Sequence, residues 1–365
     1  MPPPCDKTKR PPSWKVWFIA ARPHTLTASV APNIVSYSAC LALLSENSEN
    51  ISLPFLDIAH LRNLAFQWTA FCMLMQLGTN LHNDYADFVK GADTDKRVGQ
   101  PRATQQGWLT PSQTSNAAGS VLLMGLGLGI SFLYQIWQTN RSMNEEGAAM
   151  SHLAIMAFIV LSSIFNAFAY TGGPWPLGYL GLGNFSIGYI GLGDLFVFLY
   201  FGLVATLTLP YLYLTTTATT ISSSGNLQDT LKKFLPYAIQ VAALATNIIV
   251  VNNLRDRHTD VLADKRTLAV RLGAAFCMRE YLVNLVITYG IQLCMAVSPI
   301  RRTQSFSYYE AAVQLLPLLT VPLAMKEWKA ICTKEGSALN AHVGGAAKVQ
   351  FFFCILLAVS FRISS

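Results

Sequence analysis

Two clusters of carboxylate and amide side chains are the residues of this sequence best suited to chemistry, and each follows a long apolar run. After the run 64–78 come Asn80, Asn83, Asp84 and Asp87. After the run 234–251 come Asn252, Asn253, Asp256 and Asp260. Spacings of i, i+4 and i+7 in the first cluster, and of i, i+3 and i+7 in the second, predict that each set projects as one stripe from a helix.

Carboxylates with amide neighbours are hard oxygen ligands that suit Mg²⁺ when phosphate oxygens complete its coordination. Two facing stripes could hold two Mg²⁺ ions around one diphosphate, because the metal charge offsets the repulsion among the carboxylates. Basic side chains that could contact phosphate oxygens follow both clusters, namely Lys90, Arg97, Arg102, Lys265 and Arg266. A solvated rim of surface ion pairs would account for any one of these residues, but the repeated pattern favours a shared site for metal and diphosphate.

The elements that carry these clusters are predicted to lie in a membrane. Of 365 residues, 52% are hydrophobic and only 12% are charged, which is about half the charged fraction of an average soluble domain. Nine apolar runs are long enough to cross a bilayer as helices: 24–44, 64–86, 117–137, 152–170, 194–214, 234–254, 276–298, 308–325 and 346–363. We therefore expect an all-α, polytopic membrane protein with nine transmembrane helices in one domain, 21–365, after a short polar tail, 1–20, that has no cleavable secretory signal.

The distribution of Lys and Arg predicts an orientation in the membrane. With the N-terminus inside, 19 of the 26 basic residues fall on inner segments and 7 fall elsewhere, which agrees with the enrichment of Lys and Arg in inner loops. Both acidic clusters then lie at the inner face. A cation-coupled secondary transporter is the rival from another class, but it predicts carboxylates near the middle of the membrane.

A short duplication lies between the two clusters. Residues 178–184 read Gly-Tyr-Leu-Gly-Leu-Gly-Asn, and residues 188–194 read Gly-Tyr-Ile-Gly-Leu-Gly-Asp. A period of ten residues is too short for a solenoid repeat, so the duplication is interpreted as a small insertion. The sequence leaves open which copy lines the site.

Several longer stretches resemble the UbiA-type superfamily of intramembrane aromatic prenyltransferases, and within it the 1,4-dihydroxy-2-naphthoate branch that makes menaquinone and phylloquinone. The resemblance is carried by 21–26, 83–93, 97–107, 170–179, 191–194 and 252–273, with a weaker similarity at 315–322. Two features depart from the family pattern. Asp264 stands where the family usually has Gly, and the duplication interrupts the third shared stretch.

This resemblance implies a helix bundle around a central cavity open to lipid, a Mg²⁺ cofactor, and two substrates, an allylic prenyl diphosphate and 1,4-dihydroxy-2-naphthoate. Ionisation of the diphosphate, attack by the ring and loss of CO₂ would follow. Partners are membrane lipid and the substrates, with no nucleic acid. Menadiol, homogentisate or 4-hydroxybenzoate stay open as alternative acceptors, as do the prenyl chain length, the oligomeric state and the host membrane (bacterial, plastid or endomembrane).

The resemblance also implies roles for individual residues. The expected metal ligands are Asp84, Asp87, Asp256 and Asp260. Asp93 is expected to act as a further catalytic carboxylate near the metal or the aromatic substrate. The residues expected to contact the diphosphate or assist there are Asn80, Asn83, Lys90, Arg97, Arg102, Asn253 and Lys265. Candidates for the aromatic-substrate site are Tyr170 and Asp194.

Overall fold

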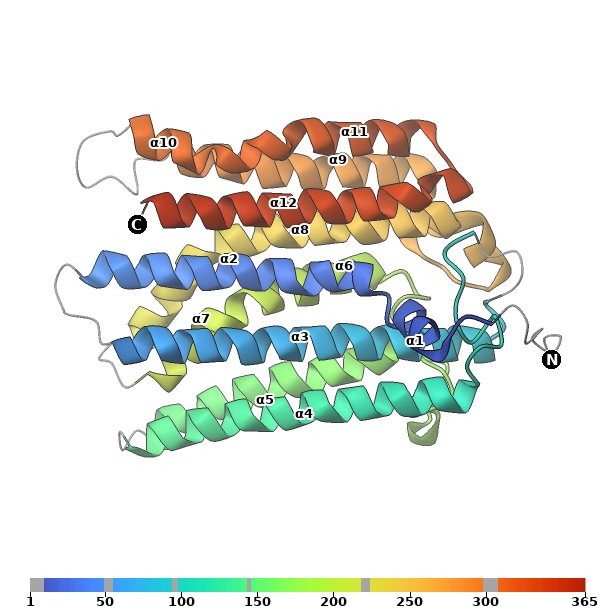
Figure 1. The fold of residues 1–365 in the computed structure, drawn as a ribbon, viewed down its shortest axis with the longest axis horizontal. Helices are drawn as coiled ribbons and strands as arrows, with labels where there is room; N and C mark the ends of the chain where they lie inside the picture. The colour runs from blue at the N-terminus through green and yellow to red at the C-terminus, as the bar shows by residue number, and fades with distance from the viewer. Residues whose placement is uncertain are drawn as a thin grey trace.

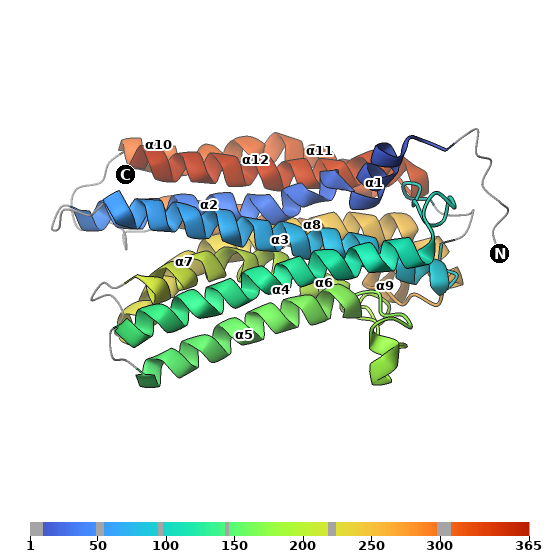
Figure 2. The same cartoon turned by 60° about the horizontal axis from the view of Figure 1, so that its bottom comes forward.

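The structure is a computed structural model that describes residues 10–48, 55–93, 98–142, 146–217, 224–297 and 308–364. Long helices lie side by side along one axis and form one bundle (Figure 1 and Figure 2). No strand occurs in these described ranges. The all-α fold predicted from the sequence is therefore confirmed.

The first half of the bundle contains α1 (Ser13–Ala21), α2 (Pro23–Ser48), α3 (Phe55–Val89), α4 (Pro111–Ser142) and α5 (Glu146–Ala169). A loop with the short 3-10 turn η2 (Leu177–Leu180) leads to α6 (Gly193–Val197), the π-helical segment η3 (Phe198–Val204) and α7 (Ala205–Thr216), which follow one another without a break. The second half contains α8 (Ser224–Leu262), α9 (Leu268–Val297), α10 (Tyr308–Gln314), η6 (Leu316–Thr320), α11 (Val321–Thr333), η7 (Gly336–Leu339) and α12 (Asn340–Ser364).

Seven helical stretches within the described residues are long and apolar enough to cross a membrane: 25–45, 111–142, 149–169, 193–216, 227–262, 268–297 and 336–363. Seven of the nine predicted runs coincide with them. The run 64–86 lies in α3, which is not among the seven, and the run 308–325 is divided among α10, η6 and α11. The protein is thus a multi-pass membrane protein, while the count of nine spans stays a prediction.

Small and polar side chains allow the helices to pack closely where lipid offers no hydrophobic driving force. A Cβ added to Gly202 of η3 would lie 2.0 Å from the Cβ of Ala242 on α8, so only glycine permits this approach. Between α8 and α9, the buried Gln240 donates from Nε2 to Oε1 of Gln292 at 2.8 Å. These contacts hold α8, which carries the second acidic cluster, against η3 and α9.

The two helices that carry the acidic clusters, α3 and α8, run in the same direction and finish at the same end of the bundle, on the right in Figure 1. We call this the site end. The short helix α1 and the loops that follow α3, α5 and α8 gather there (Figure 1 and Figure 2). The structure therefore places both clusters at one end of the bundle, as the Lys and Arg distribution predicts.

Candidate active site

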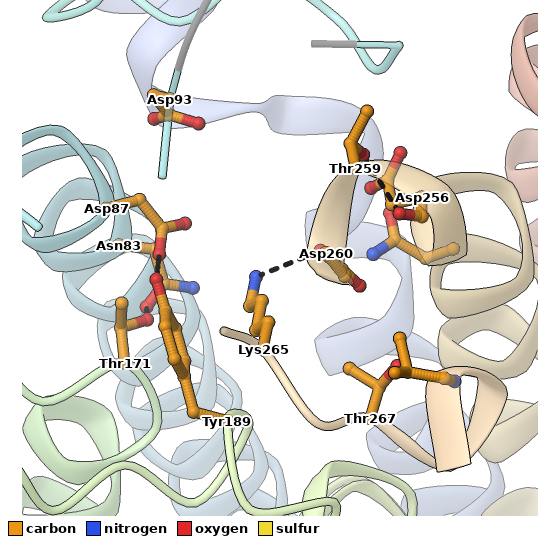
Figure 3. Close-up of polar contacts among 12 residues, drawn as sticks. Asn83, Asp87, Asp93, Thr171, Tyr189, Asp256, Thr259, Asp260, Lys265 and Thr267 are labelled. Carbon is orange, nitrogen blue, oxygen red and sulfur yellow. Dashed lines mark hydrogen bonds and ion pairs between the residues drawn. The ribbon is translucent and has the colours of Figure 1, made fainter. Parts of the chain in front are cut away.

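Both acidic clusters line one cavity of about 240 Å³ at the site end. From α3 the lining residues include Asn80, Asn83 and Asp87, and from α8 they include Asn252, Asn253, Asp256 and Asp260. Asp93, Arg102, Tyr170 and Lys265 line the same cavity from the adjoining segments. Figure 3 shows Asn83 and Asp87 on one side, Asp256 and Asp260 on the other, and Lys265 between them.

Arg102 is the counter-ion of the first wall. Its Nη1 lies 2.8 Å from Oδ2 of Asp87 and 3.2 Å from Oδ2 of Asp93, and it donates to the backbone oxygen of Asn83 at 2.6 Å. Burial alone would lower the pKa of Arg102, but the Asp87 and Asp93 carboxylates raise it above its ordinary value. The loop after α3 is thereby folded back onto the helix, and a permanent positive charge stands at the cavity wall.

Asp84 does not line this cavity. It is buried, and its Oδ2 accepts from the backbone N–H of Thr104 at 3.3 Å. The lining stripe on α3 is instead Gln76, Asn80, Asn83 and Asp87. Since each helical residue turns by about 100° from the one before, Asp84 lies at the edge of this stripe, about 40° from Asn80 and about 100° from Asn83. Of the four carboxylates predicted to bind metal, three are brought together at the cavity.

Arg255 organises the second wall, and the sequence reasoning did not assign it a role. Its Nε and Nη2 donate to the two oxygens of Asp256 at 2.8 and 2.6 Å, and Nη2 also donates to Oδ1 of Asn252 at 2.8 Å. Its Nη1 donates to Oδ1 of Asn340 on α12 at 3.3 Å, and the Asn340 amide donates to the backbone oxygen of Val98 at 3.0 Å. This chain of contacts fixes Asp256 relative to α12 and to the loop after α3.

Tyr189 joins the two walls and was also missed by the sequence reasoning. Its hydroxyl donates to Oδ1 of Asp87 at 2.9 Å, and its backbone oxygen accepts from the N–H of Arg266 at 2.8 Å. The ammonium groups of Lys90 and Lys265 lie 4.4 and 5.1 Å from the centre of its ring. Burial and then the Asp87 carboxylate raise the pKa of Tyr189, so the hydroxyl stays protonated and acts as a donor.

The two lysines are held beside the cavity by further contacts. Lys90 donates to the backbone oxygen of Thr171 at 2.5 Å, and burial lowers the pKa of Lys90. Thr171 in turn donates from its hydroxyl to Oδ1 of Asn83. Nζ of Lys265 lies 3.9 Å from Oδ1 of Asp260 (Figure 3). Both ammonium groups therefore stand between the carboxylates and the loop that carries Tyr189.

The contacts of Tyr189 decide which copy of the duplication is at the site. Gly188, which begins the second copy, lines the cavity, and Tyr189 reaches Asp87. Tyr179 is the equivalent residue of the first copy, and it is 84% exposed. The second copy therefore lies against the acidic clusters, and the first copy is the part that projects.

The remaining predicted site residues take different positions. Tyr170 lines the cavity, whereas Asp194 is buried outside the lining and accepts from the Asn253 amide at 3.4 Å. The side chain of Arg266 is 67% exposed and pairs with Asp264 at 3.2 Å, pointing away from the clusters. Arg97 lies outside the described residues.

An apolar pocket of about 90 Å³ adjoins the polar cavity. The two share the lining residues Thr79, Tyr170, Val197 and Phe201. The pocket extends between α3, α5 and the α6–α7 stretch, where its lining includes the aromatic residues Trp68, Phe71, Phe196 and Tyr200. A ligand with a charged head and an apolar tail therefore finds matching surroundings for both parts.

The fold and the site together define the class of protein. It is a multi-pass membrane protein with a polar site at one end of the helix bundle, and this site adjoins an apolar pocket. The chain belongs to the UbiA prenyltransferase family, whose profile matches residues 38–329. It is therefore a membrane prenyltransferase, and the resemblance recognised in the sequence is confirmed.

Individual relatives agree with this assignment. The 1,4-dihydroxy-2-naphthoate octaprenyltransferase of Mycobacterium tuberculosis is 32% identical over 270 residues, which cover 72% of each chain. The protein of the same name from Haemophilus influenzae is 29% identical over 351 residues, 96% of each chain. The UbiA prenyltransferase domain-containing protein 1 homolog of Drosophila melanogaster is 28% identical over 349 residues, which cover 95% of this chain and 79% of the relative.

Proposed function

We propose that this protein transfers a prenyl group from an allylic diphosphate to 1,4-dihydroxy-2-naphthoate, with loss of CO₂, in the biosynthesis of menaquinone or phylloquinone. The observation that carries the proposal is the single cavity lined by both acidic clusters and joined to an apolar pocket. The names of relatives at 29–32% identity support the choice of acceptor.

The donor set of the cavity fits Mg²⁺ bound together with a diphosphate. Asp87 with Asn83, and Asp256 with Asp260, offer carboxylate and amide oxygens on facing walls. In the described residues no three His, Cys, Asp or Glu side chains form a metal site by themselves. Mg²⁺ in this cavity would take one or two carboxylates and complete its shell with substrate oxygens and water. When bound, Mg²⁺ would neutralise the charge that develops on the leaving diphosphate.

Asp84 contributes to this site indirectly in our proposal. By accepting from the Thr104 N–H, it holds the loop that carries Arg102. Arg102 then stands against Asp87 at the wall where the diphosphate would bind. Asp93, which lines the cavity and pairs with the same Arg102, is proposed to complete this wall.

The side chains around the cavity are suited to separate parts of the reaction. Lys90, Lys265 and Arg102 can donate to phosphate oxygens as the allylic C–O bond breaks and its electron pair stays with the diphosphate. The prenyl tail would lie in the apolar pocket next to Trp68 and Phe196. The ring carbon that bears the carboxylate then bonds to the allylic carbon, the C–CO₂ bond breaks, and its electron pair restores the aromatic ring.

The test uses the purified protein in lipid nanodiscs with Mg²⁺ and one acceptor at a time: 1,4-dihydroxy-2-naphthoate, menadiol, homogentisate or 4-hydroxybenzoate. Geranylgeranyl, phytyl and longer diphosphates serve as donors. We expect a product with the mass of the naphthoate plus one prenyl group and minus CO₂, formed only with Mg²⁺. The proposal would be contradicted if another acceptor gave product and 1,4-dihydroxy-2-naphthoate gave none, or if the product kept its carboxyl group.

A further inference from the structure

The loop 174–182 projects sideways from the bundle at the site end. It contains η2, and in Figure 2 it extends beyond the end of α5, away from the other helices. The backbone N–H of Gly173 donates to the oxygen of Gly183 at 2.9 Å, which closes the base of this loop. The N–H of Ile187 donates to the oxygen of Ala169 at 2.9 Å, so the base is fixed to the last turn of α5.

The surface of the 174–182 loop is apolar and uncharged. Tyr179 is 84% exposed, Leu180 is 70% exposed and Leu182 is 42% exposed. The whole connection 171–193 contains no Asp, Glu, Lys or Arg. The next loop at the same end, 263–267, carries Asp264, Lys265 and Arg266 in five residues. Contiguous exposed apolar groups of this kind usually mark a contact with another molecule or with a membrane.

The loop continues a surface that faces lipid. α5 contains a membrane-spanning stretch, and its exposed side chains Phe158, Leu161 and Phe165 follow one another at i, i+3 and i+7 toward the site end. The 174–182 loop begins nine positions after Phe165 and extends sideways from the helix axes (Figure 1 and Figure 2). A sideways projection at the end of a spanning helix lies at the level of the lipid headgroups.

A second element at this end has the same character. The short helix α1 buries Val16 and Ala20 but exposes Trp14 at 70% and Phe18 at 58%. Trp and Tyr are enriched at membrane–water interfaces, where their rings sit at the depth of the headgroups. In Figure 2, α1 and the 174–182 loop lie on opposite sides of the bundle, so the site end carries interfacial side chains on both sides.

We propose that the 174–182 loop is a membrane anchor that places Tyr179 and Leu180 at the boundary between headgroups and acyl chains. The partner is the lipid surface, because the loop is uncharged and continuous with the lipid-facing stripe of α5. The same connection carries Thr171 and Tyr189 at the active site. Anchoring its outer part holds its inner part against the cavity, and the inference does not depend on the identity of the acceptor substrate.

The test places the photoreactive residue p-benzoylphenylalanine at Tyr179 in the full chain, purified into nanodiscs of phosphatidylcholine and phosphatidylglycerol. Irradiation followed by intact-protein mass spectrometry is expected to show protein–lipid adducts. The same residue at Phe158 is the positive control, since this position faces lipid. The matched control is Asp264, on another loop of the site end, with a side chain that is 86% exposed in a charged segment. We expect few lipid adducts there.

The proposal is overturned if the Tyr179 probe labels lipid no more than the Asp264 probe, or if it forms cross-linked dimers in place of lipid adducts. A second measurement covers the case in which the probe disturbs the loop. Tyr179→Trp adds one indole, so the variant should fluoresce more than the unchanged protein. We expect lipids brominated near the headgroup to quench this additional fluorescence. Absence of this added quenching would also refute the anchor.

Discussion

Replacing Tyr189 by Phe removes one hydroxyl group and keeps the ring. The hydroxyl donates to Asp87 at 2.9 Å, while the ring lies 4.4 Å from the ammonium of Lys90 and 5.1 Å from that of Lys265. One side chain thus orients a proposed metal ligand and two proposed diphosphate-binding cations. Substitution of Tyr189 by Phe removes only the hydrogen bond to Asp87, whereas substitution by Leu also removes the ring contacts with Lys90 and Lys265.

The expected size of the effect follows from these contacts. A hydrogen bond to a charged group contributes about 1.5–3 kcal/mol, and removal of a group that orients a metal-ligating carboxylate typically costs about 10- to 100-fold in metal affinity or activity. We expect Tyr189→Phe to raise the Mg²⁺ concentration for half-maximal rate by about 10- to 100-fold. Tyr189→Leu also removes two cation–π contacts of about 0.5–2 kcal/mol each, so the KM for the prenyl diphosphate should rise as well.

The assay is initial-rate product formation in nanodiscs, with Mg²⁺ and prenyl diphosphate varied separately. Tyr179 offers a matched control because it stands in the same Gly-Tyr-x-Gly-Leu-Gly sequence but is 84% exposed. Tyr179→Phe keeps the exposed ring and removes only its hydroxyl, so the rate should change by no more than about twofold. The reasoning is refuted if Tyr189→Phe leaves the Mg²⁺ dependence unchanged, or if the Tyr179 variant loses as much activity.

Four further outcomes are expected. Asp87→Asn and Asp256→Asn should each lower turnover by more than about 100-fold without altering the elution volume of the purified protein; near-normal rates in both would contradict the proposed metal site. Arg255→Lys keeps the charge but loses the two-pronged contact with Asp256, so about 10-fold or more Mg²⁺ should be needed for half-maximal rate, and an unchanged Mg²⁺ titration would argue against this positioning role. Gly202→Val should lower the free energy of unfolding by about 1–3 kcal/mol, seen as a lower melting temperature in detergent, because the new Cβ meets Ala242; an unchanged melting temperature would show that η3 and α8 can separate without cost. In calorimetry, a non-reacting thiodiphosphate analogue should bind about 5- to 150-fold more tightly with Mg²⁺ than without it, and equal affinities would show that the two ligands bind independently.

The parts of the protein that depend on local sequence were predictable. The apolar runs in the sequence predicted the positions of seven membrane-spanning helices. A helix in lipid must satisfy its own backbone hydrogen bonds and carry apolar side chains over about 20 residues, so such segments can be recognised from sequence. Helical spacing predicted one stripe of Asn80, Asp84 and Asp87 and another of Asn253, Asp256 and Asp260. All of these residues except Asp84 line the cavity. The basic inner loops predicted that both stripes share one end of the bundle. Together these features predict one shared site at that end of the bundle.

Contacts between distant segments were not predictable in this way. Tyr189 meets Asp87 across 102 positions of the chain, and both copies of the duplication present the same local pattern. The hydrogen bond from the Gly173 N–H to the Gly183 oxygen closes a loop that contains Tyr179 and leaves Tyr189 outside it, and this pairing is not visible in the local sequence. The sequence does show that Arg255 directly precedes Asp256, which could have suggested a role beside the metal site. Its hydrogen bond to Asn340, however, depends on how α12 packs.

The charges at the cavity explain why metal and diphosphate should depend on each other. Each of the four carboxylates that line the described cavity lies within ion-pair distance of a cationic side chain. The pairs are Asp87 and Asp93 with Arg102, Asp256 with Arg255, and Asp260 with Lys265. A diphosphate that drew Arg102 and Lys265 away would leave the buried carboxylates beside them uncompensated, which is strongly unfavourable.

A divalent cation that bound alone would meet the opposite difficulty, because it would have to displace Arg102 and Lys265 from the carboxylates and leave their charges without a partner. When both ligands bind together, the metal takes the carboxylates and the phosphate oxygens take the released cations, so each charge keeps an opposite charge nearby. The favourable coupling between Mg²⁺ and diphosphate is therefore a consequence of the ion pairs already present in the site. It also disfavours ionisation of an allylic diphosphate bound without its metal, since the released negative charge would then face carboxylates that have lost their partners.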